Sequence, residues 1–131
     1  MIIDSSAVVA VLLLEPEAEQ IATAISDASH CRISSANWLE AAIVIDARGK
    51  PEARADFDKF FAETSTEILP VTAETVTRAR EAYFRFGRGR HKAALNFGDC
   101  FAYATASLAG EPLLFKGNDF PHTDIEPALK D

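Results

Sequence analysis

The stretch Met1-Ile2-Ile3-Asp4-Ser5-Ser6, followed by the apolar run Ala7–Leu14, decides the fold of this chain. Its first three residues predict a short strand that ends at Asp4. Ser5 or Ser6 suits the N-cap of a helix that runs to Leu14. A strand followed at once by a helix is typical of an α/β protein, in which sites form beyond the carboxyl ends of the strands.

Strands and helices alternate along the rest of the chain. Further strands are predicted at 30–34, 67–71 and 112–116, and a fifth short one at 124–126. Five more helices are predicted from capping residues and apolar spacing. The first three run from Pro16 to about Ala28, from Ser34 or Ser35 to Arg48 with Gly49 as its stop, and from Pro51 with an apolar stripe of Phe57, Phe60 and Phe61. The last two run from Ala73 to Phe86 with Thr72 as N-cap, and from Cys100 to Leu108 after Asp99 with Gly110 as its stop. The alternation predicts a mainly parallel sheet with helices on both faces.

The 131 residues suit a single domain, spanning residues 1–131, because no linker, repeat or low-complexity stretch divides them. Cys31 and Cys100 show no Cys-x-x-Cys spacing, so we expect two free thiols in a reducing cytoplasm. The run Ala7–Leu14 is too short to cross a bilayer and has no basic segment before it. The expectation is therefore a cytoplasmic protein without a membrane partner.

The charge of the chain is unevenly distributed. The net charge is −7, which argues against general coating of nucleic acid. Six of the 13 basic residues nevertheless lie between Arg78 and Lys92, opposed there only by Glu81. Such a segment can steer a polyanion toward an acidic pocket, or it can be a solvated helix face and loop. The sequence leaves both interpretations open.

Four acidic residues stand at positions that an α/β fold brings to one edge of its sheet: Asp4, Glu40, Asp99 and Asp119. Asp4 and Asp119 follow predicted strands, and Asp99 precedes a helix. Each also has a purely structural interpretation, since Asp4 and Asp99 suit N-caps and Asp119 suits a turn. Glu40 is harder to explain in this way. Its helix is broadly apolar, and a structural Glu there needs a distant cation such as Arg48 or Lys116.

If the four acids converge, they require a cation. Two carboxylates about 4 Å apart repel by roughly 4 kcal/mol at an effective dielectric near 20. Mg²⁺ or Mn²⁺ removes that repulsion, prefers oxygen ligands and keeps waters that can act as nucleophile. His30, His91 and His122 share no metal-ligand spacing, and Gly-x-x-x-x-Gly-Lys-Ser/Thr and Gly-x-Ser-x-Gly are absent. Carboxylates alone favour phosphoryl-transfer chemistry over a zinc hydrolase.

The same segments resemble a known family. Met1–Ala7 is similar to the opening of PIN-domain ribonucleases, and Leu95–Ala104 and Leu113–Phe120 resemble signature segments of VapC toxins, the nuclease half of bacterial toxin–antitoxin pairs. His122–Ile125 continues the pattern. The resemblance spans the whole chain and implies a three-layer α/β/α PIN-like domain with a short, mainly parallel central sheet. It further implies Mg²⁺- or Mn²⁺-dependent RNA cleavage, a homodimer and a small cognate antitoxin.

The resemblance also implies roles for residues at matching positions. Asp4, Asp99 and Asp119 would hold one or two metals, with Glu40 acting directly or through water, and Ser6 would bind a metal-ligated water. Asp124 is a rival for the place of Asp119. Water would attack the phosphate in line and leave a 5′-phosphate and a 3′-hydroxyl. The flanking RNA phosphates would be held by Arg88, Arg90 and Lys92.

Three other functions compete with this interpretation. A haloacid-dehalogenase-like phosphatase also has an Asp after its first strand, but it uses a second Asp where Ser6 stands here. A receiver-like phosphoacceptor needs paired acids near the first strand, although Lys116 resembles its late lysine. The third alternative is a non-catalytic PIN-like binding module. Six aromatic residues suit either the core or a partner groove: Trp38, Phe57, Phe60, Phe61, Tyr83 and Phe84.

Overall fold

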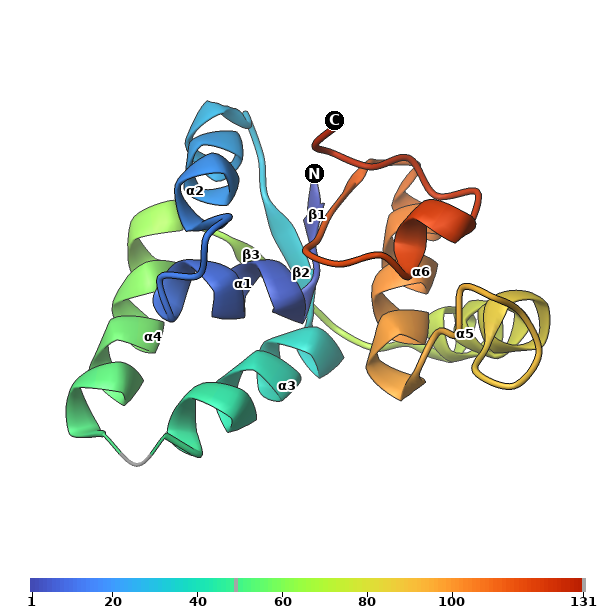
Figure 1. The fold of residues 1–131 in the computed structure, drawn as a ribbon, viewed down its shortest axis with the longest axis horizontal. Helices are drawn as coiled ribbons and strands as arrows, with labels where there is room; N and C mark the ends of the chain where they lie inside the picture. Colours follow the sequence, from blue (N-terminus) through green and yellow to red (C-terminus); the bar gives the residue numbers. More distant parts are fainter. Residues whose placement is uncertain (49, 131) are drawn as a thin grey trace.

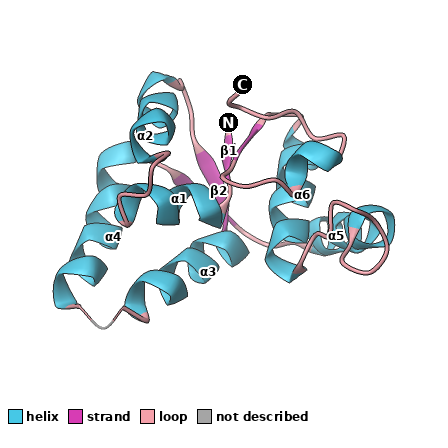
Figure 2. Cartoon of the chain, viewed as in Figure 1, coloured by secondary structure: helices cyan, strands magenta, loops and turns pink. Residues whose placement is uncertain are grey.

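The computed structural model describes residues 1–48 and 50–130, which form a short parallel sheet between two layers of helices (Figures 1 and 2). In these residues the elements follow one another as β1 (Ile2–Ile3), α1 (Ser5–Leu12), α2 (Ala18–Asp27), β2 (Arg32–Ser34), α3 (Ser35–Asp46), α4 (Pro51–Thr64), β3 (Glu67–Leu69), α5 (Ala73–Phe86), α6 (Phe97–Ala109), β4 (Leu113–Leu114) and the 3₁₀ turn η1 (Phe120–His122). The predicted alternation and the three-layer α/β/α class are confirmed.

The sheet is parallel throughout, in the order β3-β2-β1-β4. Ile2 pairs with Arg32 of β2 on one side and with Leu113 of β4 on the other. The chain runs outward from β1 through β2 to β3 and then returns to the opposite side of β1. The order therefore reverses between β1 and β4, and such a switch point opens a crevice at the carboxyl ends of the strands.

Alternate residues of the central strands face the two helical layers. Ile3 and Leu114 pack with residues of α1, α2, α3 and α4, whereas Ile2 and Leu113 pack with residues of α5 and α6. Figure 1 shows the same division, with α5 and α6 on one side of the sheet. Because successive strand side chains point to opposite faces, a two-residue strand contributes to both cores.

Several predicted boundaries are wrong. The second helix begins at Ala18 instead of Pro16, and the third ends at Asp46, short of Arg48; its predicted stop at Gly49 lies outside the described residues. The fifth strand at 124–126 is also wrong. The chain meets β4 only through a single bridge between Leu113 and Pro127, next to a hydrogen bond from the Leu113 amide to the Glu126 carbonyl (2.9 Å).

The aromatic residues divide between the core and the surface. Trp38, Phe57, Phe60 and Phe61 form one cluster, in which Trp38 and Phe57 meet edge to face with ring centroids 5.3 Å apart. Tyr83 and Phe84 are exposed. Cys31 and Cys100 are free and buried. The helices found in residues 1–48 and 50–130 are all too short or too polar to cross a membrane.

The amino ends of the strands share an ion-pair cluster. Glu111, just before β4, accepts hydrogen bonds from the Met1 ammonium group (2.5 Å) and from the Arg32 guanidinium group. Both cations lie at the amino ends of β1 and β2, and all three side chains are partly buried. This end of the sheet therefore joins three strands through paired charges.

Candidate active site at the carboxyl edge of the sheet

Asp4 lies directly after β1, at the switch point of the sheet, and is 2% exposed. Its Oδ2 atom caps α1, accepting hydrogen bonds from the Ser6 amide (3.0 Å) and the Ser6 hydroxyl (2.6 Å). Its Oδ1 atom is buried and finds no hydrogen-bond partner among the described residues. The N-cap interpretation is thus correct for one oxygen, and the other oxygen remains available for a ligand.

The Ser6 hydroxyl connects the carboxyl ends of β1 and β4. It donates to Asp4 and accepts a hydrogen bond from the Lys116 amide (2.9 Å). The side chain of Lys116 turns away from this junction to Glu15 (3.2 Å) and Glu17 (3.7 Å). Lys116 is therefore not the distant cation that a structural Glu40 would require.

Glu40 projects from the second turn of α3 and contacts neutral donors. Its Oε1 atom accepts a hydrogen bond from the Ser5 hydroxyl (2.5 Å) and a longer one from the Asn37 amide group (3.4 Å). The Asn37 amide group also donates to the carbonyl of Gly98 in α6 (3.0 Å), which links α3 to α6. Glu40 therefore lies between the start of α1 and the start of α6.

Asp99 belongs to the first turn of α6 and does not open the helix, so the prediction that it precedes the helix is wrong. The helix begins at Phe97 with Asn96 as its N-cap. Asn96 accepts from the Asp99 amide (2.9 Å), and the Asp99 carboxylate accepts from the Asn96 amide (3.1 Å). This capping box fixes one carboxylate oxygen of Asp99 and orients the side chain at the helix N-terminus.

Asp119 and Asp124 have different surroundings. Asp119 is exposed, precedes η1 without a side-chain capping bond, and lies close enough for its charge to act on Asp99. Asp124 instead accepts a hydrogen bond from the Tyr103 hydroxyl and pairs with Arg85 at 3.4 Å. The geometry favours Asp119 over Asp124 as the fourth member of the group.

Burial and mutual repulsion shape the titration of this group. Burial raises the pKa of Asp4 to about 7; the hydrogen bonds from Ser6 oppose the shift, and the charges of Asp99 and Glu40 add to it. Burial likewise raises the pKa of Asp99 to about 6, with the Asn96 amide and Arg88 opposing and Asp119 and Glu40 adding. Among the described residues, Arg88 and the hydrogen-bond donors offset only part of the effect of burial and of the neighbouring carboxylates, so the pKa of Asp4 and that of Asp99 both stay raised.

The donor set fits a hard divalent cation. The buried and unpartnered Oδ1 of Asp4 is the oxygen that a metal would satisfy. The carboxylates of Asp99 and Glu40 are near enough for their charges to act on Asp4, and Asp119 acts in the same way on Asp99. Within residues 1–48 and 50–130, no three His, Cys, Asp or Glu side chains converge tightly enough to enclose a metal. An open arrangement suits Mg²⁺, which keeps several waters and uses only one or two carboxylates directly.

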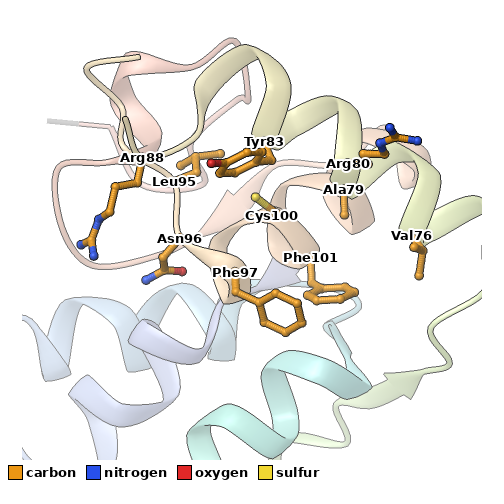
Figure 3. Close-up of a pocket in the computed structure, with 10 residues that line it drawn as sticks. All are labelled: Val76, Ala79, Arg80, Tyr83, Arg88, Leu95, Asn96, Phe97, Cys100 and Phe101. Carbon is orange, nitrogen blue, oxygen red and sulfur yellow. The ribbon is translucent and has the colours of Figure 1, made fainter. Parts of the chain in front are cut away.

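An apolar groove lies beside the acids, between α5 and the start of α6 (Figure 3). Its volume is about 590 Å³. Arg88 and Asn96 lie at one end and Val76 at the other, with Phe97 and Phe101 adjacent along one wall. Phe97 is 81% exposed, two residues before Asp99. The sequence patterns did not indicate this groove, because its residues come from two helices and a loop.

The predicted RNA-binding residues are not equivalent. Arg88 is close enough to Asp99 for its charge to oppose part of the rise in the pKa of Asp99, and Lys92 is exposed. Arg90 is already engaged: its Nε atom donates to the Phe84 carbonyl (3.1 Å), and its guanidinium group stacks 4.6 Å from the Phe84 ring centre. Arg88 and Lys92 are therefore freer than Arg90 to meet a phosphate.

Sequence reasoning missed the neutral residues that hold the acids. Ser5 was considered only as a cap, and Asn37, Gly98 and Asn96 were not singled out. Asn37 is fully buried, three residues before Glu40 in an apolar helix. A polar residue at such a position, one turn from an unexplained Glu, is the signal that was available.

Comparisons with known proteins show the family to which the chain belongs. The PIN domain family profile matches residues 1–126. The chain is 48% identical over 127 residues to Ribonuclease VapC30 of Mycobacterium tuberculosis, covering 95% of each chain. It is 47% identical over 126 residues to Ribonuclease VapC of Mycolicibacterium smegmatis, covering 95% of this chain and 97% of that protein.

Solved structures share the fold at low sequence identity. The crystal structure of Mycobacterium tuberculosis VapC20, described as a sarcin-ricin loop cleaving toxin, aligns with a TM-score of 0.73 and 15% identity, covering 96% of this chain and 98% of that one. A toxin-antitoxin complex from Klebsiella pneumoniae aligns with a TM-score of 0.70 and 16% identity, over 94% and 92%. The chain therefore belongs to the PIN-domain family and, within it, to the VapC ribonucleases.

Proposed function

We propose that this chain is a Mg²⁺- or Mn²⁺-dependent endoribonuclease that acts as the toxin of a toxin–antitoxin pair. The observation that carries the proposal is the buried, unpartnered Oδ1 of Asp4, a carboxylate that lies within reach of the charges of Asp99 and Glu40, while Asp99 in turn lies within reach of the charge of Asp119. Family membership gives the reaction class, because the relatives at 46–48% identity are named as ribonucleases.

In this proposal Asp4, Asp99, Asp119 and Glu40 would hold the metal together, one or two of them directly and the others through its bound waters. When bound, the ion neutralises charge on the phosphate and makes its bound water more acidic. Ser6 keeps Asp4 in place through two hydrogen bonds, and Asn96 does the same for Asp99. In-line attack by water breaks the bond from phosphorus to the 3′ oxygen and leaves a 5′-phosphate and a 3′-hydroxyl.

Arg88 and Lys92 supply the cationic contact with RNA that the acidic group cannot provide. Arg88 lines the apolar groove and is close enough for its charge to act on Asp99, so it can hold a phosphate next to the scissile one. Arg90 supports the loop through Phe84 and contributes less. A phosphate contact of this kind makes RNA affinity depend on salt concentration.

The proposal includes a homodimer and a small antitoxin as partners. Large apolar side chains are exposed on three helices, among them Leu39 and Ile43 of α3, Val76 of α5 and Phe97 of α6. Exposed apolar side chains on this scale favour protein contacts. Molar-mass measurement of the purified chain, alone and after co-expression with a candidate antitoxin, tests both partners.

The deciding experiment is cleavage of structured and single-stranded RNA by the purified chain, with Mg²⁺, Mn²⁺ or EDTA, followed by mapping of the new ends. We expect metal-dependent cleavage with 5′-phosphate and 3′-hydroxyl ends. Absence of cleavage by an intact, folded chain on all substrates would instead support the non-catalytic binding module. Cleavage that persists in EDTA would contradict the metal-dependent mechanism.

A further inference from the structure

Gly98 stands against the carboxylate of Glu40. A Cβ atom added at Gly98 would lie 2.2 Å from Oε2, 2.6 Å from Oε1 and 2.7 Å from Cδ of Glu40. These distances are far inside ordinary contact between non-bonded atoms. The three nearest atoms all belong to one carboxyl group, so the space that Gly98 leaves free is the space that Glu40 uses.

Two further contacts hold this arrangement from the other sides. The Ser5 hydroxyl donates to Oε1 of Glu40, and the Asn37 amide group spans from the Gly98 carbonyl (3.0 Å) toward the same carboxylate (3.4 Å). Ser5, Asn37 and Gly98 are all buried, whereas the Glu40 carboxylate reaches the edge where Asp4 and Asp99 lie. Glu40 is thus enclosed by the first turns of α1, α3 and α6.

The backbone of Gly98 does not require glycine. Gly98 is the second residue of α6 and lacks the positive φ angle found at Gly89, Gly110 and Gly117. A helical glycine is less favourable than alanine because it loses more conformational freedom on folding. Its presence here is therefore explained by the close approach of Glu40.

We propose that Gly98 and Ser5 are positioning residues for Glu40. The absence of a side chain at Gly98 leaves room for the Glu40 carboxylate, and the hydrogen bond from the Ser5 hydroxyl orients that carboxylate toward Asp4 and Asp99. This inference rests on the proposed metal-dependent function for its consequence. The contact between Gly98 and Glu40 does not depend on that function.

A thermal-unfolding cycle without metal tests the contact. In the otherwise unchanged chain, Gly98→Ala should change the Tm less favourably than it does in a chain without Glu40, because the carboxylate must move away from the added methyl group and give up its hydrogen bond from Ser5. In a Glu40→Ala background the same substitution should raise the Tm by roughly 2–4 °C, since alanine then replaces glycine in a helix without the clash. A change of the same sign and size in both backgrounds would overturn the proposal, because Gly98 would then act independently of Glu40.

A Mn²⁺ titration tests the consequence. In the unchanged background, Gly98→Ala and Ser5→Ala should each raise the Mn²⁺ concentration for half-maximal RNA cleavage, or for half-maximal thermal stabilisation, by roughly 10- to 100-fold. In a chain that already carries Glu40→Ala, neither Gly98→Ala nor Ser5→Ala should raise this Mn²⁺ concentration further. Unchanged Mn²⁺ dependence of Gly98→Ala, or an equal loss in both backgrounds, would refute the positioning role.

The two experiments distinguish an error in the proposed ribonuclease function from an error in the proposed role of Gly98. If the parent chain cleaves no RNA at any Mn²⁺ concentration, the proposed function is wrong. The Tm cycle would still decide whether Gly98 acts through Glu40, because it needs neither RNA nor metal.

Discussion

Both ends of the central sheet carry acidic residues, but within the described part of the chain these residues are paired with cations at one end and unpaired at the other. At the amino ends, Glu111 is joined to the Met1 ammonium group and to Arg32. At the carboxyl ends, Asp4 leaves a buried oxygen without a partner among the residues described, and its acidic neighbours raise its pKa further. Paired charges join three strands at one end, whereas carboxylates repel one another at the other end, which is where we propose that a cation binds.

This difference explains how a small domain can carry an unfavourable site. A partly buried carboxylate with two cations contributes to the fold, whereas a buried carboxylate beside other carboxylates costs stability until a ligand arrives. The fold tolerates that cost because neutral donors, namely Ser5, Ser6, Asn37 and Asn96, hold the acids in position. If this is correct, substitutions at the amino end should affect stability, and substitutions at the carboxyl end should affect RNA cleavage.

The largest effect should follow from Asp99→Asn. Asparagine can still accept the hydrogen bond from the Asn96 amide, so the capping box and the helix survive. The loss of a negative ligand should lower the rate of metal-dependent RNA cleavage by at least about 100-fold. The measurement is the initial cleavage rate in Mg²⁺, with circular dichroism as the control for folding. Full activity of this variant would end the assignment of the carboxyl edge as the active site.

Asp119→Asn should have a smaller effect at the same edge. Asp119 is exposed, and its charge acts on Asp99. We therefore expect the variant to need a roughly 10- to 100-fold higher metal concentration for half-maximal cleavage. The half-maximal Mn²⁺ concentration for cleavage measures this. An unaltered value would leave the carboxyl edge with three functional acids.

The pH dependence of stability should reveal the unpaired acid. In the metal-free chain the folded state holds a proton on Asp4 up to a pKa of about 7, whereas the unfolded state releases it near 3.8. The stability present below pH 3.8 is therefore lost as the pH rises through about 7, by up to about 4 kcal/mol. Urea unfolding of the parent and Asp4→Asn between pH 4 and 8 checks the sign: the variant should show the shallower decline.

Glu111→Gln should affect only the fold. Removal of the charge leaves the Met1 ammonium group and Arg32 without their common partner, so the free energy of unfolding should fall by about 1–3 kcal/mol. Cleavage at 25 °C should stay at the parent rate. A loss of cleavage in a variant that remains folded would show that the two ends are coupled.

Asp124→Asn should give the smallest change. Its pair with Arg85 is exposed, and its contact with Tyr103 can be kept by the amide oxygen, so stability should change by less than about 1 kcal/mol. Metal-dependent cleavage should remain within about twofold of the parent. Because Asp119→Asn is the matched variant five residues away, a reversal of the two results would exchange their roles.

Much of the fold could be predicted because its signals are local. The strand Ile2–Ile3, the helix behind it and the capping residue Thr72 each follow from a few neighbouring residues. The errors came where distant contacts decide. Residues 124–126 were predicted as a strand, but the chain bends past β4 and makes only one bridge, at Pro127. Asp99 was placed before its helix because its own capping propensity hid the stronger cap at Asn96.

Neighbouring residues are enough to predict the architecture and to single out the four acids, because helix and strand periodicity is local and acids flanked by small and apolar residues are conspicuous. How those acids are held depends on the tertiary structure. The hydrogen bond from Ser5 to Glu40 and the space that Gly98 leaves for Glu40 each involve residues 35 or more positions apart. Such contacts exist only after the sheet has brought the starts of α1, α3 and α6 together, so no local pattern could have specified them.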